Sequence, residues 1–326
     1  MINVYVHENG GLQRVDLPQG GLPRDTVWID VREPQGDDLQ RVQSALQIEM
    51  PTREEMQEIE LSSRIYQEGN ATFLTALIPV NADTSTPGST AITFIRTPGP
   101  VVTLRYADPQ PFKNFISRSV RSNSGVTTPD LALIGVFDAI IDREADLLER
   151  MGAELDGISK AIFATKASKA DVASADLEEA VRRLGQVEDL NSRVRESAHT
   201  LLRMMTYLGT GGLSETKPSK DFRNRVKILQ RDLQSITEQS AFLAHKGSFL
   251  LDATLGLINI QQTAIIKIFS VAAVVFLPPT LVASIYGMNF DIMPELKWDL
   301  GYPFAIGLMV LSAALPYLYF KRKGWL

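Results

Sequence analysis

Uncharged, mostly apolar residues form two long runs near the C-terminus, Ile268 to Tyr286 and Leu300 to Phe320. A hydrocarbon core roughly 30 Å thick needs about 20 helical residues to cross it, so both runs are long enough. A short loop over residues 288–299 joins them, and a basic tail over residues 321–326 follows. The pattern therefore predicts two membrane-spanning helices, at residues 265–287 and 300–320.

The first part of the chain, residues 1–125, alternates between strand-like and helix-like stretches. Asp37 to Gln47 and Thr52 to Ile59 predict helices, and in the second of these Thr52 and Glu55 have the spacing of a capping box. Five segments rich in β-branched and aromatic residues predict strands: Ile2 to His7, Val27 to Val31, Ala71 to Val80, Thr90 to Arg96 and Val101 to Tyr106. We therefore expect a mixed α/β domain at residues 1–125.

Residues 126–217 have a helical pattern and predict a helical hairpin region. The glycine-rich stretch Gly209 to Gly212 lacks the Gly-Lys-Ser/Thr ending of a phosphate loop, so it predicts a plain connector. Beyond Ser219 no helix-breaking residue occurs before Pro278, and Lys220 to Gly287 would form one helix of roughly 100 Å. Residues 218–264 are the predicted stalk, which continues directly into the first membrane-spanning helix.

A regular seam runs along the stalk at alternating steps of four and three, as in a coiled coil. It consists of Phe222, Val226, Leu229, Leu233, Ile236, Ser240, Leu243, Gly247, Leu250, Thr254 and Leu257. A helix of this length cannot bury its seam within the small domain of one subunit, so we expect a bundle made by several subunits.

A second stripe, at steps of three, four or seven, includes the hydroxyl groups of the first span other than that of Tyr286. Its members are Asp252, Asn259, Thr263, Ile266, Ser270, Ala273, Leu277, Thr280, Ser284 and Met288. Small and hydroxyl residues allow membrane helices to pack closely, which is one interpretation. The other is a water-filled axial pathway with apolar constrictions at Ile266 and Leu277, which requires a symmetric oligomer. Pro278 and Pro279 fit either a simple kink or a part in gating.

Composition narrows the possible functions. The net charge of −5 over 326 residues argues against a nucleic-acid-binding protein. The chain has no cysteine, which excludes disulfides and thiol catalysis. His7, His199 and His245 have no histidine partner at helical spacing, so a histidine zinc site is not expected. No nucleophile, metal cluster or phosphate loop stands out, and we expect neither an enzyme nor an organic cofactor.

The distribution of charge predicts the orientation in the membrane. Lys321, Arg322 and Lys323 follow the second span and Lys267 precedes the first, whereas the loop between the spans is acidic. By the positive-inside rule, both termini face the cytoplasm and the loop faces outward. The N-terminus shows no cleavable signal peptide. We therefore expect a multi-pass protein of the cell inner (plasma) membrane with a cytoplasmic N-terminal domain.

Several sequence motifs lie between and after the two spans: Tyr286-Gly287-Met288-Asn289-Phe290, Met293-Pro294-Glu295-Leu296-Lys297-Trp298, Gly301-Tyr302-Pro303 and the ending Tyr319 to Leu326. With these motifs the chain resembles the CorA family of divalent-cation channels. The similarity is dense from Ile258 to Leu326 and looser at Val27 to Asp30 and Glu58 to Glu60. The resemblance implies a funnel-shaped homopentamer that takes up Mg²⁺, often with some Co²⁺ or Ni²⁺. It also implies that Mg²⁺ bound between the cytoplasmic domains holds the pore shut.

Specific residues receive roles at the two ends of this expected pathway. A ring of Asn289 amide oxygens can bind the water shell of Mg²⁺, an ion that dehydrates reluctantly and prefers oxygen ligands. Gly287 and Met288 complete the expected selectivity site. Asp291 and Glu295 could concentrate cations at the entrance or serve only solubility. Asp252 is the candidate acidic ring at the cytoplasmic end, although it could equally be a solvated stalk charge.

Regulatory Mg²⁺ sites are expected among the acids before the stalk, without a named pair. The candidates are Glu144, Asp146, Glu149, Glu154, Asp156, Asp171, Asp176, Glu178 and Glu179.

Two alternative functions stay open. One is a relative of the same superfamily that carries Zn²⁺ or chiefly Co²⁺ and Ni²⁺, but zinc is disfavoured because the chain keeps Met-Pro-Glu-Leu at 293–296. The other is a tail-anchored helical scaffold protein, which needs no inward-facing Asn289.

Overall fold

The computed structural model describes residues 1–18, 21–58, 60–84, 86–121, 124–164, 170–210, 219–289 and 293–325. The chain forms two compact units. The first comprises Met1–Ala164 and Ala180–Leu251, and the second comprises Thr165–Glu179 and Asp252–Leu326. The predicted domain boundaries remain predictions, whereas the helices and strands can be compared with those of the structure one by one.

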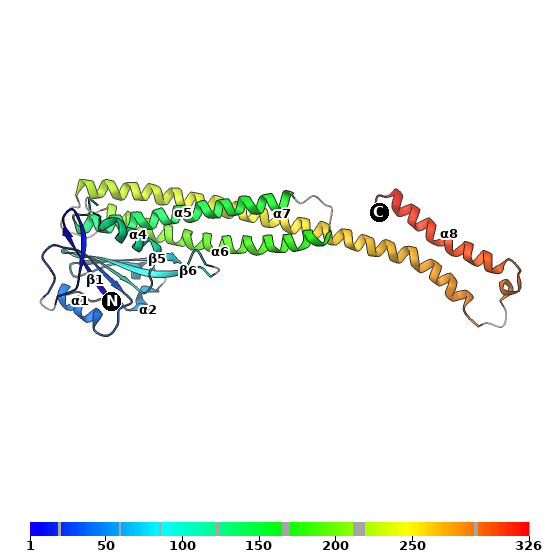
Figure 1. The fold of residues 1–326 in the computed structure, drawn as a ribbon, viewed down its shortest axis with the longest axis horizontal. Helices are drawn as coiled ribbons and strands as arrows, with labels where there is room; N and C mark the ends of the chain where they lie inside the picture. Colours follow the sequence, from blue (N-terminus) through cyan, green and yellow to red (C-terminus); the bar gives the residue numbers. More distant parts are fainter. Residues whose placement is uncertain are drawn as a thin grey trace. The chain divides into compact units, whose positions relative to one another are not determined.

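A seven-stranded sheet with the order β2-β1-β3-β7-β6-β5-β4 lies at the centre of the N-terminal part (Figure 1). Only β3 and β7 pair in parallel, with Trp28 opposite Val101, and the other neighbours are antiparallel. The strands are β1 (Ile2–Glu8), β2 (Gly11–Val15), β3 (Thr26–Arg32), β4 (Ile65–Glu68), β5 (Ala71–Val80), β6 (Gly88–Arg96) and β7 (Val101–Arg105). All five predicted strands are confirmed. The short edge strands β2 and β4 were not predicted.

Helices cover both faces of this sheet (Figure 1). One face packs under α1 (Asp38–Leu46), α2 (Arg53–Met56) and α3 (Leu61–Arg64), and its core includes Ile29, Val31, Met56, Phe73 and Leu104. The other face lies against α4 (Gln110–Ser119) and α5 (Pro129–Ala164). The predicted helix at Asp37 to Gln47 is confirmed. The predicted capping box of α2 is also confirmed, because Thr52 and Glu55 each accept a hydrogen bond from the other's backbone N–H.

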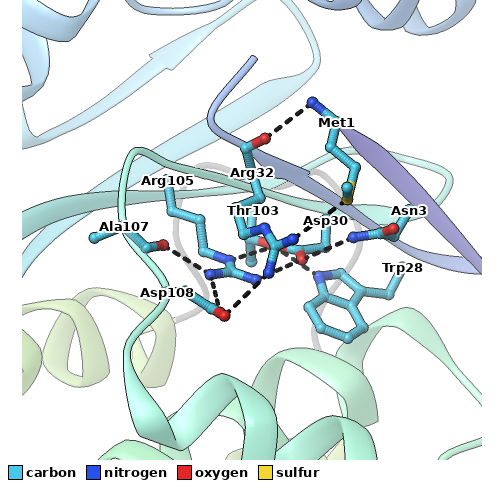
Figure 2. A network of polar contacts seen from close by, with 9 residues as sticks. All are labelled: Met1, Asn3, Trp28, Asp30, Arg32, Thr103, Arg105, Ala107 and Asp108. Carbon is cyan, nitrogen blue, oxygen red and sulfur yellow. Dashed lines mark hydrogen bonds and ion pairs between the residues drawn. The ribbon is translucent and has the colours of Figure 1, made fainter. Parts of the chain in front are cut away.

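A buried ion pair joins the two parallel strands (Figure 2). The Arg105 guanidinium donates from Nε to Asp30 Oδ1 at 2.8 Å and from Nη2 to Asp30 Oδ2 at 2.9 Å, and both side chains are almost fully buried. Thr103 donates a third bond to Asp30, and Asp108 accepts from Arg105 at 2.7 Å. Asp30 therefore belongs to the internal structure of the sheet domain, although it lies in the part of the sequence that carries the looser family resemblance.

Three long helices follow the sheet: α5, α6 (Ala170–Gly209) and α7 (Lys220–Tyr286). They confirm the helical pattern of this region and the single long helix, while the hairpin region at 126–217 stays a prediction. Gly211, Gly212 and the rest of the predicted connector up to 218 lie outside the described residues. In the part of α7 from Lys220 to Leu250, the buried side chains are the seam residues Phe222, Val226, Leu229, Leu233, Ile236, Ser240, Leu243 and Leu250.

The seam prediction was therefore wrong about its partner, because one chain buries this part of the seam by itself. The α6 residue Asn191 donates to the Ser240 carbonyl at 3.1 Å and accepts from the Ser240 hydroxyl at 2.9 Å, with both side chains buried. Lys246 of α7 pairs with Asp156 of α5 at 2.6 Å. The helices α5 and α6 have 36 and 40 residues, so they are long enough to cover the first half of α7.

The second unit contains the rest of α7, a short 3₁₀ helix η1 (Pro294–Lys297) and α8 (Gly301–Arg322). Both α7 and α8 contain segments long and apolar enough to cross a membrane. The helix α7 continues through Pro278 and Pro279 to Tyr286. The two predicted apolar helices are thus present as elements of the structure.

Candidate functional site

One side of the membrane segment of α7 faces α8. The ammonium of Lys267 lies 5.8 Å from the ring centroid of Trp325, and that ring stacks on Phe320 with centroids 5.2 Å apart. Val271, one helical turn after Lys267, is only 4% exposed, and Val275 and Val282 continue this side as partly buried residues. The contact between Lys267 and Trp325 was not predicted; the only sequence signal for it is a lysine at one membrane boundary and a tryptophan in the basic tail.

The second stripe lies on nearly the opposite side of α7. With 3.6 residues per turn, its mean direction is roughly 130° around the helix from the mean direction of Lys267, Val271, Val275 and Val282. Every predicted pathway residue on it is exposed in the single chain: Asn259, Thr263, Ile266, Ser270, Ala273, Leu277, Thr280 and Ser284. The two predicted constrictions, Ile266 and Leu277, are 64% and 65% exposed. Helix α8 therefore leaves this stripe uncovered.

Two hydroxyl groups on the stripe, those of Thr263 and Thr280, are oriented as acceptors. Thr263 donates its hydroxyl proton to the Asn259 carbonyl at 2.8 Å, and Thr280 donates to the Phe276 carbonyl at 2.8 Å. Each bond runs back to the residue four positions earlier and uses the only proton of the hydroxyl. The oxygen lone pairs remain for outside donors. Water molecules around a cation point their hydrogens outward, so such a surface suits a hydrated cation.

Exposure alone does not distinguish the stripe from the flanks of the helix. Phe269 and Phe276, which lie off the stripe centre, are 71% and 70% exposed. These large apolar side chains are suited to lipid or to another helix, whereas the stripe carries the hydroxyl and amide groups.

Pro278 and Pro279 lack the N–H groups that would bind the carbonyls of Val274 and Val275. Whether these prolines only bend the helix or aid gating stays an open prediction.

The Gly287-Met288-Asn289 segment directly follows the end of α7. Gly287 N–H donates to the Ala283 carbonyl at 3.0 Å, and Met288 N–H donates to the Ile285 carbonyl at 3.2 Å. A Cβ at Gly287 would lie 3.2 Å from the Ala283 oxygen, which is closer than ordinary contact. Met288 and Asn289 are exposed. The expected selectivity residues are therefore placed together at the end of the exposed stripe.

The loop after this segment is anchored to the start of α8. Gly301 N–H donates to the Trp298 carbonyl at 2.9 Å, and Gly301 is buried. A Cβ at Gly301 would overlap the Glu295 carbonyl oxygen, so only glycine fits there without a shift of the loop. Glu295 is exposed, and its entrance position stays a prediction. Asp291, the other predicted entrance acid, lies outside the described residues.

The predicted acids before the membrane have different environments. Asp252 is exposed and follows the same helical spacing as the stripe. Glu154 pairs with Arg183 at 2.6 Å, and Lys246 holds the pKa of Asp156 below its usual value. The other candidates with described side chains, Asp146, Glu149, Asp176, Glu178 and Glu179, are exposed, while the side chain of Asp171 is not described. Among the residues that the structure describes, no three His, Cys, Asp or Glu side chains are grouped to hold a metal.

Glu144 is a correction to the predicted set of surface acids. It is 1% exposed, and Ser197 donates a hydrogen bond to its Oε1 atom. Burial raises the pKa of Glu144 to about 8, against the smaller opposing effect of the Ser197 bond. A carboxyl buried inside one chain is not available to an ion between subunits. The sequence indicated this burial, because Glu144 lies on the same helix, α5, as the apolar neighbours Ile140, Ile141, Leu147 and Leu148.

Comparisons with known proteins show the family and the fold of this chain. The family described as "CorA-like Mg2+ transporter protein" matches residues 24–322. The magnesium transport protein CorA of Escherichia coli strain K12 is 36% identical, and that of Sodalis glossinidius is 35% identical; in both cases the alignment covers 100% of this chain and 100% of the relative. The structure of the CorA magnesium transporter from Methanocaldococcus jannaschii superposes with a TM-score of 0.76 at 17% identity, covering 100% of this chain and 99% of that one.

Proposed function

Because the chain belongs to the CorA family of Mg²⁺ transporter proteins, we propose that it is a channel through which hydrated Mg²⁺ enters the cell. The family is one of transporters, and full-length relatives of this chain are magnesium transport proteins. The two long apolar helices suit a protein of the inner membrane. The basic residues 321–323 and Lys267 favour cytoplasmic termini and an outward loop.

The observation that carries this proposal is the exposed stripe on α7. It faces away from α8, presents hydroxyl oxygens as acceptors, and ends at Gly287-Met288-Asn289. A tail-anchored scaffold needs no polar face on a membrane helix that its own second helix leaves uncovered. The stripe therefore favours a pathway over an anchor.

One copy of the stripe cannot enclose a pathway, so the proposal includes a symmetric oligomer, a homopentamer by the family resemblance. The stalk part of α7 supports association. Its seam is buried within the chain, but Ile228, Phe242 and Phe249 lie on another face and are 55%, 59% and 62% exposed. Their positions recur at multiples of seven. Such a face is suited to contact with neighbouring copies.

The selectivity proposal rests on Asn289. A ring of neutral amide oxygens can accept hydrogen bonds from the water shell of Mg²⁺, and it holds the ion more weakly than carboxylates would. Glu295 and Asp291 would raise the cation concentration at the outer mouth. An inside-negative potential of 100 mV is worth about 2.3 kcal/mol per charge, so a divalent cation gains roughly twice that. Internal Mg²⁺ is proposed to close the pore through exposed acids of the cytoplasmic part and not through Glu144.

Flux into liposomes tests this function. The purified protein is reconstituted with a fluorescent Mg²⁺ indicator inside the vesicles, under an inside-negative potential. We expect Mg²⁺ influx that stops as internal Mg²⁺ rises. Parallel runs with Co²⁺, Ni²⁺ and Zn²⁺ establish which ions compete. Vesicles that contain the protein at low internal Mg²⁺ but show no flux above protein-free vesicles would rule out the channel.

A further inference from the structure

A cavity of about 290 Å³ lies in the sheet domain, far in sequence from the membrane helices. Its walls come from α2, the end of α3, the paired strands β5 and β6, and the segment after β7. Two arginines, Arg53 and Arg64, line it together with the hydroxyls of Ser89 and Thr90. A volume near 300 Å³ is at the lower end of the range for small-molecule pockets.

Arg64 is the most informative residue of this cavity. Its side chain is only 8% exposed, and its Nε atom donates to the Glu58 carbonyl at 2.9 Å. Among the residues that the structure describes, its two terminal nitrogens have no hydrogen-bond or ion-pair partner. A guanidinium is always charged and offers five donors. Neither terminal nitrogen of Arg64 is among the fully covered atoms that lack a partner, so both are open to the cavity and can donate to an anion there.

Ser89 gives a second, independent indication. Its Oγ atom is buried and has no hydrogen-bond partner within the described part of the chain. Buried hydroxyls are normally hydrogen-bonded. Ser89 lines the cavity, so a rotation of its side chain would bring this covered hydroxyl to a ligand. Ser89 lies opposite Pro79, and Ala91 opposite Leu77, on the β5–β6 pair. The hydroxyl and the guanidinium thus belong to the same small space.

The rest of the lining describes the ligand further. Met56 and Leu77 form an apolar part, and the guanidinium of Arg53 lies 5.2 Å from the ring centroid of Tyr106. Glu196, from α6, is exposed and is the one carboxylate among the lining residues. Two guanidinium groups against one exposed carboxylate leave the cavity net positive. Arginine forks match the oxygens of phosphate and carboxylate groups.

We propose that this cavity binds a small molecule that carries an oxyanion, a phosphate or a carboxylate, beside an apolar group. The oxyanion lies between Arg64, Arg53 and the Ser89 hydroxyl, and the apolar group lies against Met56 and Leu77. The residues of this site differ from those of the proposed ion pathway, so a metabolite that binds there would act on the sheet domain. Its existence does not depend on whether the protein conducts Mg²⁺.

Binding is tested on the full chain in detergent, without added Mg²⁺, by NMR titration of inorganic phosphate, phenyl phosphate and benzoate. We expect saturable binding, tighter for phenyl phosphate than for inorganic phosphate because of the apolar part. Tighter binding of phenyl phosphate than of benzoate assigns a phosphate ligand, and the reverse order assigns a carboxylate. Arg64→Gln should weaken binding about tenfold or more, since a charged hydrogen-bond pair is worth about 1.5–3 kcal/mol. The matched control is Arg24→Gln, which changes an exposed arginine outside the cavity.

Two further variants separate ligand binding from folding. Ser89→Ala removes a hydroxyl without a partner, so it should weaken binding severalfold without lowering the unfolding temperature. Glu196→Gln removes the carboxylate beside the site and should strengthen binding. The proposal is overturned if none of the three probes binds saturably, or if Arg64→Gln and Ser89→Ala bind them as tightly as Arg24→Gln does. Neither result would affect the channel, because no flux is measured.

Discussion

The ammonium of Lys267 lies 5.8 Å from the centre of the Trp325 ring, and this contact marks the side of α7 that lies next to the segment following α8. Val271, the next residue on that side, is buried. The polar stripe from Asn259 to Ser284 consequently faces away from the second membrane helix. A packing interpretation within one chain would require the stripe to be covered by α8. What covers it comes from outside the chain: water in a pathway, other copies of the chain, or lipid, and the hydroxyl and amide groups of the stripe favour the first two over lipid.

Ile266 is expected to act as an apolar constriction. Ile266→Asn should raise Mg²⁺ flux into liposomes severalfold at internal Mg²⁺ concentrations that close the unmodified protein, because a polar ring wets more readily. Ile265→Asn is the matched control: it is the same change one position earlier, off the stripe, and Ile265 is also exposed. Equal flux through the two variants would show that Ile266 does not constrict the pathway.

Gly301 is expected to determine the shape of the outer loop. Gly301→Ala places a methyl group where the Glu295 carbonyl oxygen lies, so the loop must shift. We expect Mg²⁺ flux to fall about tenfold or more while the protein still inserts into the membrane, since misplacement of a site by about 1 Å is costly. Gly307→Ala is the control, because nothing lies within 4 Å of a Cβ built there. Similar Mg²⁺ flux through both variants would show that the geometry of this loop does not affect conduction.

Glu144 should make stability depend on pH. Its pKa is raised from 4.5 to about 8 by burial. Below pH 4.5 the carboxyl is protonated in both states and costs nothing. As pH rises from there to about 8, the unfolded chain ionises first, so the free energy of unfolding falls; above pH 8 the loss is complete.

Glu144→Gln removes this titration. We expect the variant to be more stable than the unmodified protein by about 1–3 kcal/mol at pH 8 and to show a flatter profile between pH 5 and pH 8. Urea unfolding in detergent at several pH values measures this. Glu149→Gln, an exposed position on the same helix, should leave the profile unchanged. A profile for Glu144→Gln that matches that of Glu149→Gln would contradict the buried titration.

Asp30 is expected to contribute strongly to the stability of the sheet domain. Asp30→Asn removes the buried carboxylate that binds two nitrogens of the Arg105 guanidinium, which is 1% exposed, and leaves the partly exposed Asp108 as a carboxylate partner. Breaking a buried pair from one side costs about 3–5 kcal/mol. Urea unfolding followed by tryptophan fluorescence should show this loss, whereas the exposed Asp25→Asn should lie within about 0.5 kcal/mol of the unmodified protein. A loss below about 1 kcal/mol in Asp30→Asn would mean that the pair is not needed for stability.

Local patterns predicted much of the fold correctly. The strands β1, β3, β5, β6 and β7 and the helix α1 follow from alternation and apolar spacing, and the α2 cap follows from Thr52 and Glu55. The strands β2 and β4 were missed because they are short and lie at the sheet edges, where one neighbour is enough and the residue pattern is weak. The helix α4 was also missed, because it is short and sits within the strand-rich part of the chain.

Which partner covers a helix face could not be predicted from spacing. The seam of α7 has the same period whether it meets other copies or α5 and α6, and only the structure shows Asn191 bonded to Ser240. Glu144 was misjudged for a related reason, since composition assigns acids to the surface while its apolar neighbours bury it. The candidate pathway was predicted as a set of positions. Its direction away from α8 depends on the tertiary contact between Lys267 and Trp325.

Thiol modification tests most directly whether the stripe lines a water-filled Mg²⁺ pathway. The chain has no cysteine, so single cysteines can be introduced into the unmodified sequence. Ser284→Cys lies on the stripe near the outer mouth, and Val282→Cys lies two residues earlier on the side that faces α8. A positively charged, water-soluble thiol reagent should abolish Mg²⁺ flux through Ser284→Cys and leave flux through Val282→Cys unchanged. Modification that inhibits both variants equally, or that spares Ser284→Cys, would contradict a pathway along this stripe.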